Sequence, residues 1–159
     1  HAKQFNPSIG DVVATSNRAA GTVDIVFIMA DGKTPGAEMI NGLKEYLNGR
    51  TRRPMTDLVN VSAPAEVTYT VSLTYYINRS DSARAVAIQE AVQAAVADYL
   101  VWQRTIGRDI NPSKLVALVM AAGAKRVTVT APVYTTVDAI KVSALSGNPT
   151  ISYGGLEDD

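Results

Sequence analysis

Apolar and polar residues alternate along several short stretches of the chain, which is the pattern of half-buried β-strands. The longest alternating run covers residues 67–77, where six apolar residues share one face and five hydroxyl-bearing residues share the other. This run predicts one strand with a core face and a wetter face. Shorter runs predict further strands at residues 11–16, 22–29, 58–61, 126–130, 136–142 and 150–153.

Other stretches repeat apolar residues every three or four positions, which is the period of an amphipathic α-helix. Residues 36–48 predict a first helix, and Gly49 stands where a helix-ending glycine is expected. A later helix is predicted to begin at Asn111, with Pro112 in its first turn, and to stop at Gly123. Both helices therefore have start and stop signals in the sequence.

The longest predicted helix covers about 82–106, after a cap at Ser80 or Asp81. Its apolar residues follow alternating steps of three and four, so they form one continuous seam. The seam consists of Ala85, Ile88, Val92, Ala95, Tyr99, Trp102 and Ile106. We expect this seam to be buried, and truncation of its aromatic residues to destabilise the fold.

The order of these elements predicts an α+β fold with two linked lobes, each with mixed or antiparallel strands packed on helices. Residues 1–63 are expected to form a small lobe, in which residues 1–20 are interpreted as a linker plus one strand. Residues 64–159 are expected to form a second lobe with two consecutive helices and a C-terminal strand region. The two lobes would meet near Pro64.

The amino-acid composition excludes many enzyme classes. The 159 residues contain no cysteine and one histidine, His1, which excludes disulfides, thiolate chemistry, histidine triads and multi-histidine metal sites. Fifteen basic residues balance fifteen acidic ones, so no overall field attracts nucleic acid or an anionic membrane. No apolar run reaches the length of a membrane span and no signal peptide is visible, so we expect a soluble domain.

Candidate catalytic motifs have simpler interpretations. Gly32-Lys33-Thr34 resembles the end of a phosphate-binding loop, but Phe27 stands where that loop needs a glycine, so a polar turn is favoured. A carboxylate pair can catalyse hydrolysis. The available candidates instead fit turns, a helix cap and a helix surface; they are Asp57, Asp81, Asp98 and Asp109. The sequence therefore predicts no catalytic, metal-binding or cofactor-binding residue, and no enzyme.

Three residues of the long helix lie off its seam although they are large and apolar. Val86, Leu100 and Val101 occupy positions where an isolated amphipathic helix would carry polar side chains. We interpret them as a candidate contact with another protein chain, the alternative being a core on two sides of the helix. The basic residues Arg50, Arg52 and Arg53 are a second candidate interface, the alternative being a solvated turn. A nucleic-acid patch is less favoured because no aromatic residues are interleaved.

Four segments together resemble a known family. They are Arg53–Val61 (RPMTDLVNV), Gly107–Ser113 (GRDINPS), Gly123–Val127 (GAKRV) and Tyr153–Asp159 (YGGLEDD). In this order they resemble the C-terminal part of the baseplate J-like family of contractile-tailed phages and prophages. The resemblance covers the chain from about Gly21 onward, and family members carry a further β-rich region upstream. The chain is therefore expected to be a C-terminal part of such a protein.

The resemblance implies a structural role, as a wedge protein of a contractile tail baseplate, with no catalytic residues and no cofactor. It implies contacts with other copies of the same protein and with neighbouring wedge proteins, and no nucleic-acid, membrane or small-molecule partner. The implied location is the virion tail baseplate, assembled in the bacterial host cytoplasm. Two alternatives remain: another adaptor module of a tail or injection system, and a tail-associated cell-wall hydrolase, which would need two acids facing one cleft.

Overall fold

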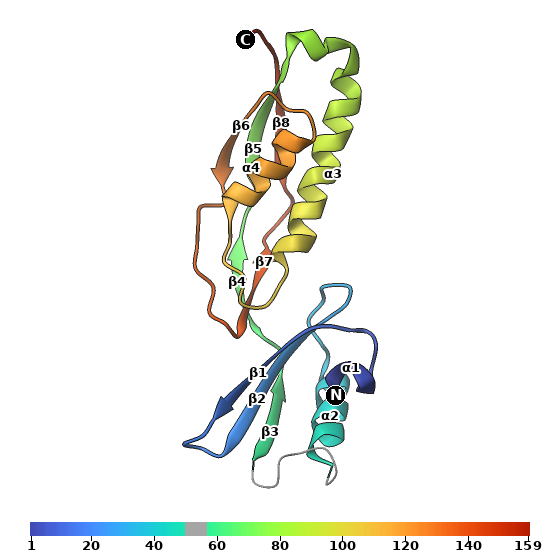
Figure 1. The fold of residues 1–159 in the computed structure, drawn as a ribbon, viewed down its shortest axis with the longest axis vertical. Helices are drawn as coiled ribbons and strands as arrows, with labels where there is room; N and C mark the ends of the chain where they lie inside the picture. Colours follow the sequence, from blue (N-terminus) through green and yellow to red (C-terminus); the bar gives the residue numbers. More distant parts are fainter. Residues whose placement is uncertain (50–56) are drawn as a thin grey trace.

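The computed structural model describes residues 1–49 and 57–159, which form two lobes stacked along the long axis of the molecule (Figure 1). We call the part before Ala63 the N-terminal lobe and the part after Pro64 the C-terminal lobe. Each lobe packs helices on a sheet with both parallel and antiparallel strand pairs, so the predicted α+β class is confirmed. None of the described helices has both the length and the apolar character needed to cross a membrane.

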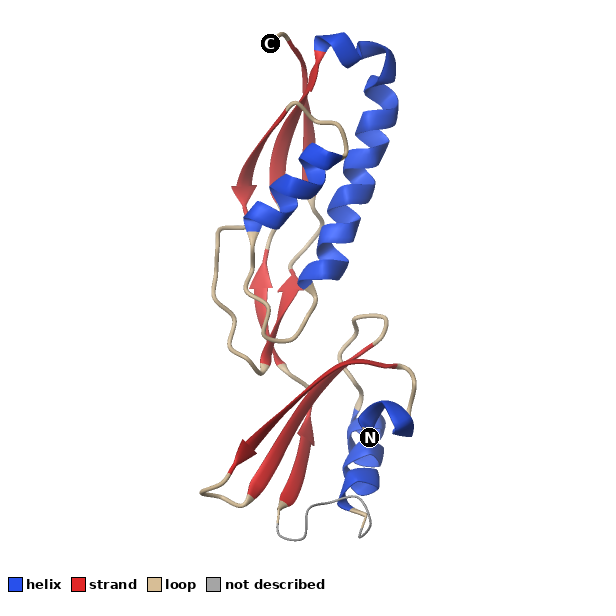
Figure 2. Cartoon of the chain, viewed as in Figure 1, coloured by secondary structure: helices blue, strands red, loops and turns tan. Residues whose placement is uncertain are grey.

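A three-stranded sheet and one main helix form the N-terminal lobe (Figure 2). Its elements are α1 (Ala2–Phe5), β1 (Ile9–Asn17), β2 (Thr22–Met29), α2 (Ala37–Asn48) and β3 (Leu58–Ser62). The strand order is β1-β2-β3, with β1 antiparallel and β3 parallel to β2. Because side chains alternate along β2, Phe27 packs with Leu43 of α2, whereas Val26 and Ile28 on the opposite face pack toward the C-terminal lobe.

The first residues pack on α2, where the sequence predicts a linker. The ring of Phe5 lies 5.2 Å from the ring of Tyr46, measured between centroids. Gly42 makes room for this contact, because a Cβ at that position would approach the Phe5 ring to 3.0 Å. The short helix α1 is thus held against α2 by aromatic packing.

The C-terminal lobe places two helices on one face of a three-stranded sheet (Figures 1 and 2). Its elements are β4 (Ala65–Tyr69), β5 (Ser72–Asn78), the 3-10 helix η1 (Arg79–Arg84), α3 (Ala85–Gln103), α4 (Pro112–Ala121), β6 (Arg126–Ala131), β7 (Lys141–Leu145) and β8 (Thr150–Glu157). The strand order of the main sheet is β6-β5-β8, with β6 antiparallel and β8 parallel to β5. A separate parallel pair, β4 and β7, extends toward the N-terminal lobe.

The alternating run 67–77 forms two strands, β4 and β5, which corrects the single strand predicted from its pattern. β4 pairs with β7, and β5 pairs with β6 and β8. The segment that pairs with this run is interrupted too, between β7 and β8. Ser146 N donates to Tyr69 O and Thr150 N donates to Val71 O, and residues 147–149 between them pair with neither β4 nor β5. The predicted core face is nevertheless correct and includes Tyr69, Val71, Leu73, Tyr75 and Ile77.

The long helix is shorter than predicted at both ends. Its first predicted turn is the 3-10 helix η1, and the side chain of Asn78, not of Ser80 or Asp81, accepts the capping hydrogen bond, from Ser80 N. At the other end α3 stops at Gln103, so Ile106 lies beyond the helix. α4 agrees with the prediction, since Asn111 accepts a hydrogen bond from Ser113 N at its start.

Two smaller boundaries also differ from the sequence prediction. The strand expected at 136–142 lies at Lys141–Leu145, because Thr135 is held instead by two backbone hydrogen bonds to Ile110. Gly49 follows α2 with φ −56°, which is not the left-handed conformation expected of a helix-ending glycine.

The core of the C-terminal lobe lies between the main sheet and the two helices. Tyr99 of α3 is at its centre with 0% exposure; its ring contacts Tyr69 edge-on at 6.4 Å and stacks on Trp102 at 6.2 Å. The buried members of this core include Leu73, Tyr75, Ile77, Ile88, Val92, Val96, Ile110, Leu115 and Val119. Trp102 is only partly buried at the margin.

Candidate functional site

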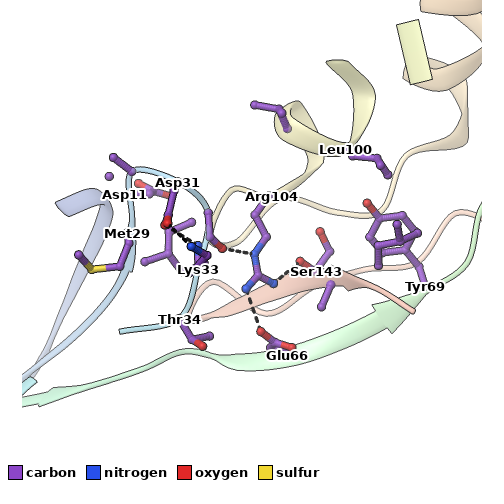
Figure 3. A pocket seen from close by; sticks show the side chains of 17 residues that line it. Asp11, Met29, Asp31, Lys33, Thr34, Glu66, Tyr69, Leu100, Arg104 and Ser143 are labelled. Atoms are coloured by element: carbon purple, nitrogen blue, oxygen red, sulfur yellow. Dashed lines mark hydrogen bonds and ion pairs between the residues drawn. The ribbon is translucent and has the colours of Figure 1, made fainter. Parts of the chain in front are cut away.

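The two lobes meet around the side chain of Arg104, which follows α3 (Figure 3). Its Nε donates to Gly32 O of the N-terminal lobe, Nη1 donates to Ser143 O of β7, and Nη2 donates to Glu66 Oε1 of β4, each at 2.8 Å. The planar guanidinium suits this arrangement, because its donors point in fixed directions. One side chain therefore connects three segments that are far apart in the sequence.

Other contacts at the junction support this arrangement. The backbone N–H of Ile106 donates to Asp11 Oδ2 at 2.9 Å, which links the end of the α3 region to β1. A small apolar cluster lies beside this bond. Its buried members are Val26, Ile28, Ile106 and Val142, with Val13 packed against them. The junction thus combines directed hydrogen bonds with a patch of apolar contact.

A groove of about 870 Å³ opens beside Arg104, with walls from both lobes. The N-terminal wall includes Met29 and Lys33, and the C-terminal wall includes Tyr69, Leu100 and Val101. Burial raises the pKa of Tyr69 to about 12, although the Arg104 charge opposes this effect, so the phenol stays protonated at neutral pH. The walls of the groove therefore combine apolar and polar side chains.

A tight turn at the groove, of the kind that the sequence analysis favours, closes at Gly32, and Lys33 and Thr34 follow it. Gly32 has φ +80°, a conformation that glycine adopts readily. Its N–H donates to Met29 O, and the N–H of Lys33 donates to Asp31 Oδ1. These amides are occupied within the turn and do not point at a phosphate site.

The predicted interface residues on α3 differ in their surroundings. Val86 and Val101 are 70% and 78% exposed, at opposite ends of the helix. Leu100 is partly buried against the C-terminal core and also lines the groove, so it is not a freely exposed position. The other candidates, Arg50, Arg52 and Arg53, lie outside the described residues.

The acidic residues considered for hydrolysis occupy separate structural positions. Asp81 pairs with Arg84 at 2.7 Å within η1, Asp98 is exposed on α3, and Asp57 directly precedes β3. Asp109 accepts hydrogen bonds in a loop, as described below. Within residues 1–49 and 57–159, no three His, Asp or Glu side chains are grouped in a way that could hold a metal ion.

Gln103, which the sequence analysis did not single out, organises the loop after α3. It is 0% exposed, and its Nε2 donates to the backbone oxygens of Arg108 and Asp109 at 3.4 and 2.9 Å. Its Oε1 accepts from Tyr99 OH at 3.1 Å and from Asn111 N at 3.0 Å. The side chain is fully hydrogen-bonded, which offsets the cost of its burial.

The GRDINPS segment is explained by packing within the lobe. Gly107 has φ +75°, and a Cβ there would lie 3.1 Å from Ala139 O. Asp109 accepts from Tyr134 OH at 2.7 Å and from Val137 N at 2.8 Å. These two hydrogen bonds lower the pKa of Asp109, because both favour the charged carboxylate. The segment therefore joins α3, α4 and the loop before β7.

The acidic C-terminal residues are bound to the C-terminal lobe by ion pairs. Glu157 pairs with Arg126, Asp158 pairs with Arg79 at 2.7 Å, and Asp159 lies 3.6 Å from Lys125 Nζ. The nearby Gly154 is required by close packing, because a Cβ there would overlap the ring of Tyr76 at 2.3 Å. The YGGLEDD segment thus fixes β8 at the end of the main sheet.

The Arg126–Glu157 pair predicts a pH effect. Hydrogen bonding to Arg126 holds the pKa of Glu157 below its ordinary value of 4.5, so the pair stabilises the fold above that pH. This contribution is lost as the pH falls through the lowered pKa.

We expect Arg126→Met to raise the pKa of Glu157, measured by NMR titration of the carboxyl carbon. Arg84→Met, which breaks a pair elsewhere, should leave that pKa unchanged; equal pKa values in wild type and Arg126→Met would contradict the pairing.

Comparisons with known proteins agree with this two-part structure. A family model described as Baseplate J-like central domain matches residues 1–63, and one described as Baseplate J-like protein C-terminal domain matches residues 69–147. Baseplate protein J of Escherichia phage P2 is 27% identical over 135 residues, covering 83% of this chain and 43% of its own length. The central-domain match starts at residue 1, before the Gly21 limit expected from the motifs.

The fold is also similar to a chain in the cryo-EM structure of the anti-feeding prophage baseplate, 6-fold symmetrised. The TM-score is 0.54 at 13% sequence identity, with 92% of this chain and 35% of that chain covered. The chain therefore spans less than half the length of either relative. Because two consecutive domain models match in order and the resemblance of the motifs is confirmed, the chain belongs to the Baseplate J-like family.

Proposed function

We propose that this chain is part of a structural component of a contractile tail baseplate, located in the assembled particle. The observation that carries this proposal is the ordered match to the central and C-terminal Baseplate J-like domains. The relatives are a phage baseplate protein and a prophage baseplate chain. The fold fits this role. The two lobes are stacked along the long axis and joined by hydrogen bonds, so the elongated sides of the molecule are available to neighbouring molecules (Figure 1).

We further propose that the protein acts as a wedge component, through contacts with other copies and with neighbouring wedge proteins, and without catalysis. The positions of the acids support this view. Asp81 and Asp109 are bound to Arg84 and Tyr134, and Asp98 stands alone on the outer surface of α3 among the described residues. The carboxylates of Asp81 and Asp109 therefore serve local structure.

The outer surface of α3 is the contact surface that we propose for a neighbouring baseplate protein. Val86 and Val101 are exposed there, and between them lie the small exposed residues Ala94 and Ala97. Small side chains permit close approach of a second body, and burying each valine would contribute about 1.5–3 kcal/mol before ordering costs. Leu100 adds to this surface only from the groove side.

Gene deletion in the parent phage or prophage tests the proposed function. We expect lysates of the deletion strain to lack tails with complete baseplates in negative-stain electron microscopy, because a missing wedge component blocks assembly. Supplying the full-length wild-type protein should restore them. Normal baseplates in the deletion strain would overturn the proposal.

The same complementation tests the α3 surface. Full-length protein carrying Val86→Asp and Val101→Asp should fold but fail to restore baseplates, since exposed substitutions usually change stability by about 0.5 kcal/mol or less. Asn41→Asp is the matched control, because it adds one charge at an exposed helical position of the other lobe. Full rescue by the double variant would show that this surface is not an interface.

A further inference from the structure

We propose that the lobe junction is a latch that holds the two lobes at one angle, and that Arg104 is its central residue. The described chain passes between the lobes once, from β3 to β4. Among the described residues, the hydrogen bonds and buried apolar contacts that connect the lobes lie around Arg104, Asp11 and the small apolar cluster. The relative position of the lobes therefore depends on few contacts.

The hydrogen bonds of Arg104 divide into two kinds. Those to Glu66 and Ser143 stay within the C-terminal lobe and fix the orientation of the guanidinium. The bond from Nε to Gly32 O crosses to the N-terminal lobe (Figure 3). The side chain is 19% exposed, so water competes little for these donors. Because Arg104 is held in place within the C-terminal lobe, its bond to Gly32 O restricts the orientation of the N-terminal lobe.

The apolar cluster at the junction cannot set the angle in the same way. Burial of Val26, Ile28 and Val142 favours contact between the lobes, but the hydrophobic effect is non-directional and tolerates sliding. Hydrogen bonds require a narrow range of distance and angle. The bonds made by Arg104 and Asp11 therefore select one arrangement from those that the apolar contact allows.

Pulsed electron–electron double resonance, which measures the distance between two spin labels, tests the latch directly. The chain has no native cysteine that would interfere with labelling. Spin labels at Glu45→Cys on α2 and Gln93→Cys on α3 report the distance between the lobes from exposed helical positions. We expect one narrow distance distribution for the labelled wild-type chain. Arg104→Ala should make it at least about twofold wider, as for a released hinge. Arg104→Lys should also widen it, because one ammonium cannot reproduce the three directed bonds.

Controls separate the latch from general loosening of the fold. Arg84→Ala removes an arginine from an exposed pair within η1 and should leave the distribution unchanged. Circular dichroism checks that each variant is folded. If Arg104→Ala fails to fold, Asp11→Ala makes the same comparison, because it removes the junction bond from Ile106 N and otherwise only a local bond from Val12 N. The proposal would be overturned if the distance distributions of the wild-type chain and of the Arg104 and Asp11 variants had the same width, whether narrow or broad. This result does not depend on the proposed baseplate role.

Discussion

Tyr99→Ala is expected to cost about 3–5 kcal/mol of unfolding free energy, a large part of the roughly 5–15 kcal/mol that keeps a typical domain folded. Tyr99 is completely buried, and its removal would leave a cavity between Tyr69 and Trp102. The hydroxyl is also lost as a donor to Gln103 Oε1. Urea denaturation followed by circular dichroism measures the change, and the loss should appear mainly as a lower midpoint.

Two further variants on the same helix serve as controls for the effect of Tyr99→Ala on the unfolding free energy. Val101→Ala changes an exposed position and should alter the unfolding free energy by about 0.5 kcal/mol or less. Trp102→Ala should cost less than Tyr99→Ala, because Trp102 is only partly buried, although both belong to the seam predicted from sequence. A Tyr99→Ala midpoint equal to that of wild type would disprove burial of the seam.

Gln103→Leu is expected to cost about 2–4 kcal/mol, although leucine is similar in size and apolar. The substitution leaves the N–H of Asn111, the carbonyl oxygen of Asp109 and the hydroxyl of Tyr99 without their partner. Buried polar groups that lose their partner cost about 1–3 kcal/mol each, and part of this is recovered by relaxation. The same denaturation measurement detects the loss.

The matched control for this substitution is Gln93→Leu. Gln93 lies on the outer surface of α3, so the same chemical change there removes no described buried hydrogen bond. It should leave stability nearly unchanged. If both variants unfold at the same urea concentration as wild type, the Gln103 network contributes nothing to the fold.

Local pattern predicted the faces of the strands better than their partners. The alternation over 67–77 identifies the buried side chains, because each strand has one face on the core. It cannot show that β4 and β5 join different sheets, since that depends on β7 and β8, more than seventy residues later. The strand predicted at 136–142 was displaced for a similar reason, namely the pairing of Thr135 with Ile110.

The candidate site was predicted only in part. Val86 and Val101 are exposed and apolar, and a helical period is sufficient to find them. The partial burial of Leu100 does not follow from the seam, which defines only one packing direction, because the lobe junction adds a second. The role of Arg104 could not be predicted, because its partners Gly32 and Glu66 are 72 and 38 positions away and carry no shared local motif.

The place of β8 in the main sheet has a consequence for synthesis on the ribosome. β8 pairs directly with the central strand β5, and Ser72 lies opposite Thr150. The C-terminal lobe therefore cannot complete its sheet until almost the whole of this segment has been translated. The N-terminal lobe, by contrast, has its three described strands by Ser62 and can fold while translation continues. Until β8 arrives, one edge of β5 is an open site for pairing with other nascent chains, so crowded expression should favour aggregation at this stage.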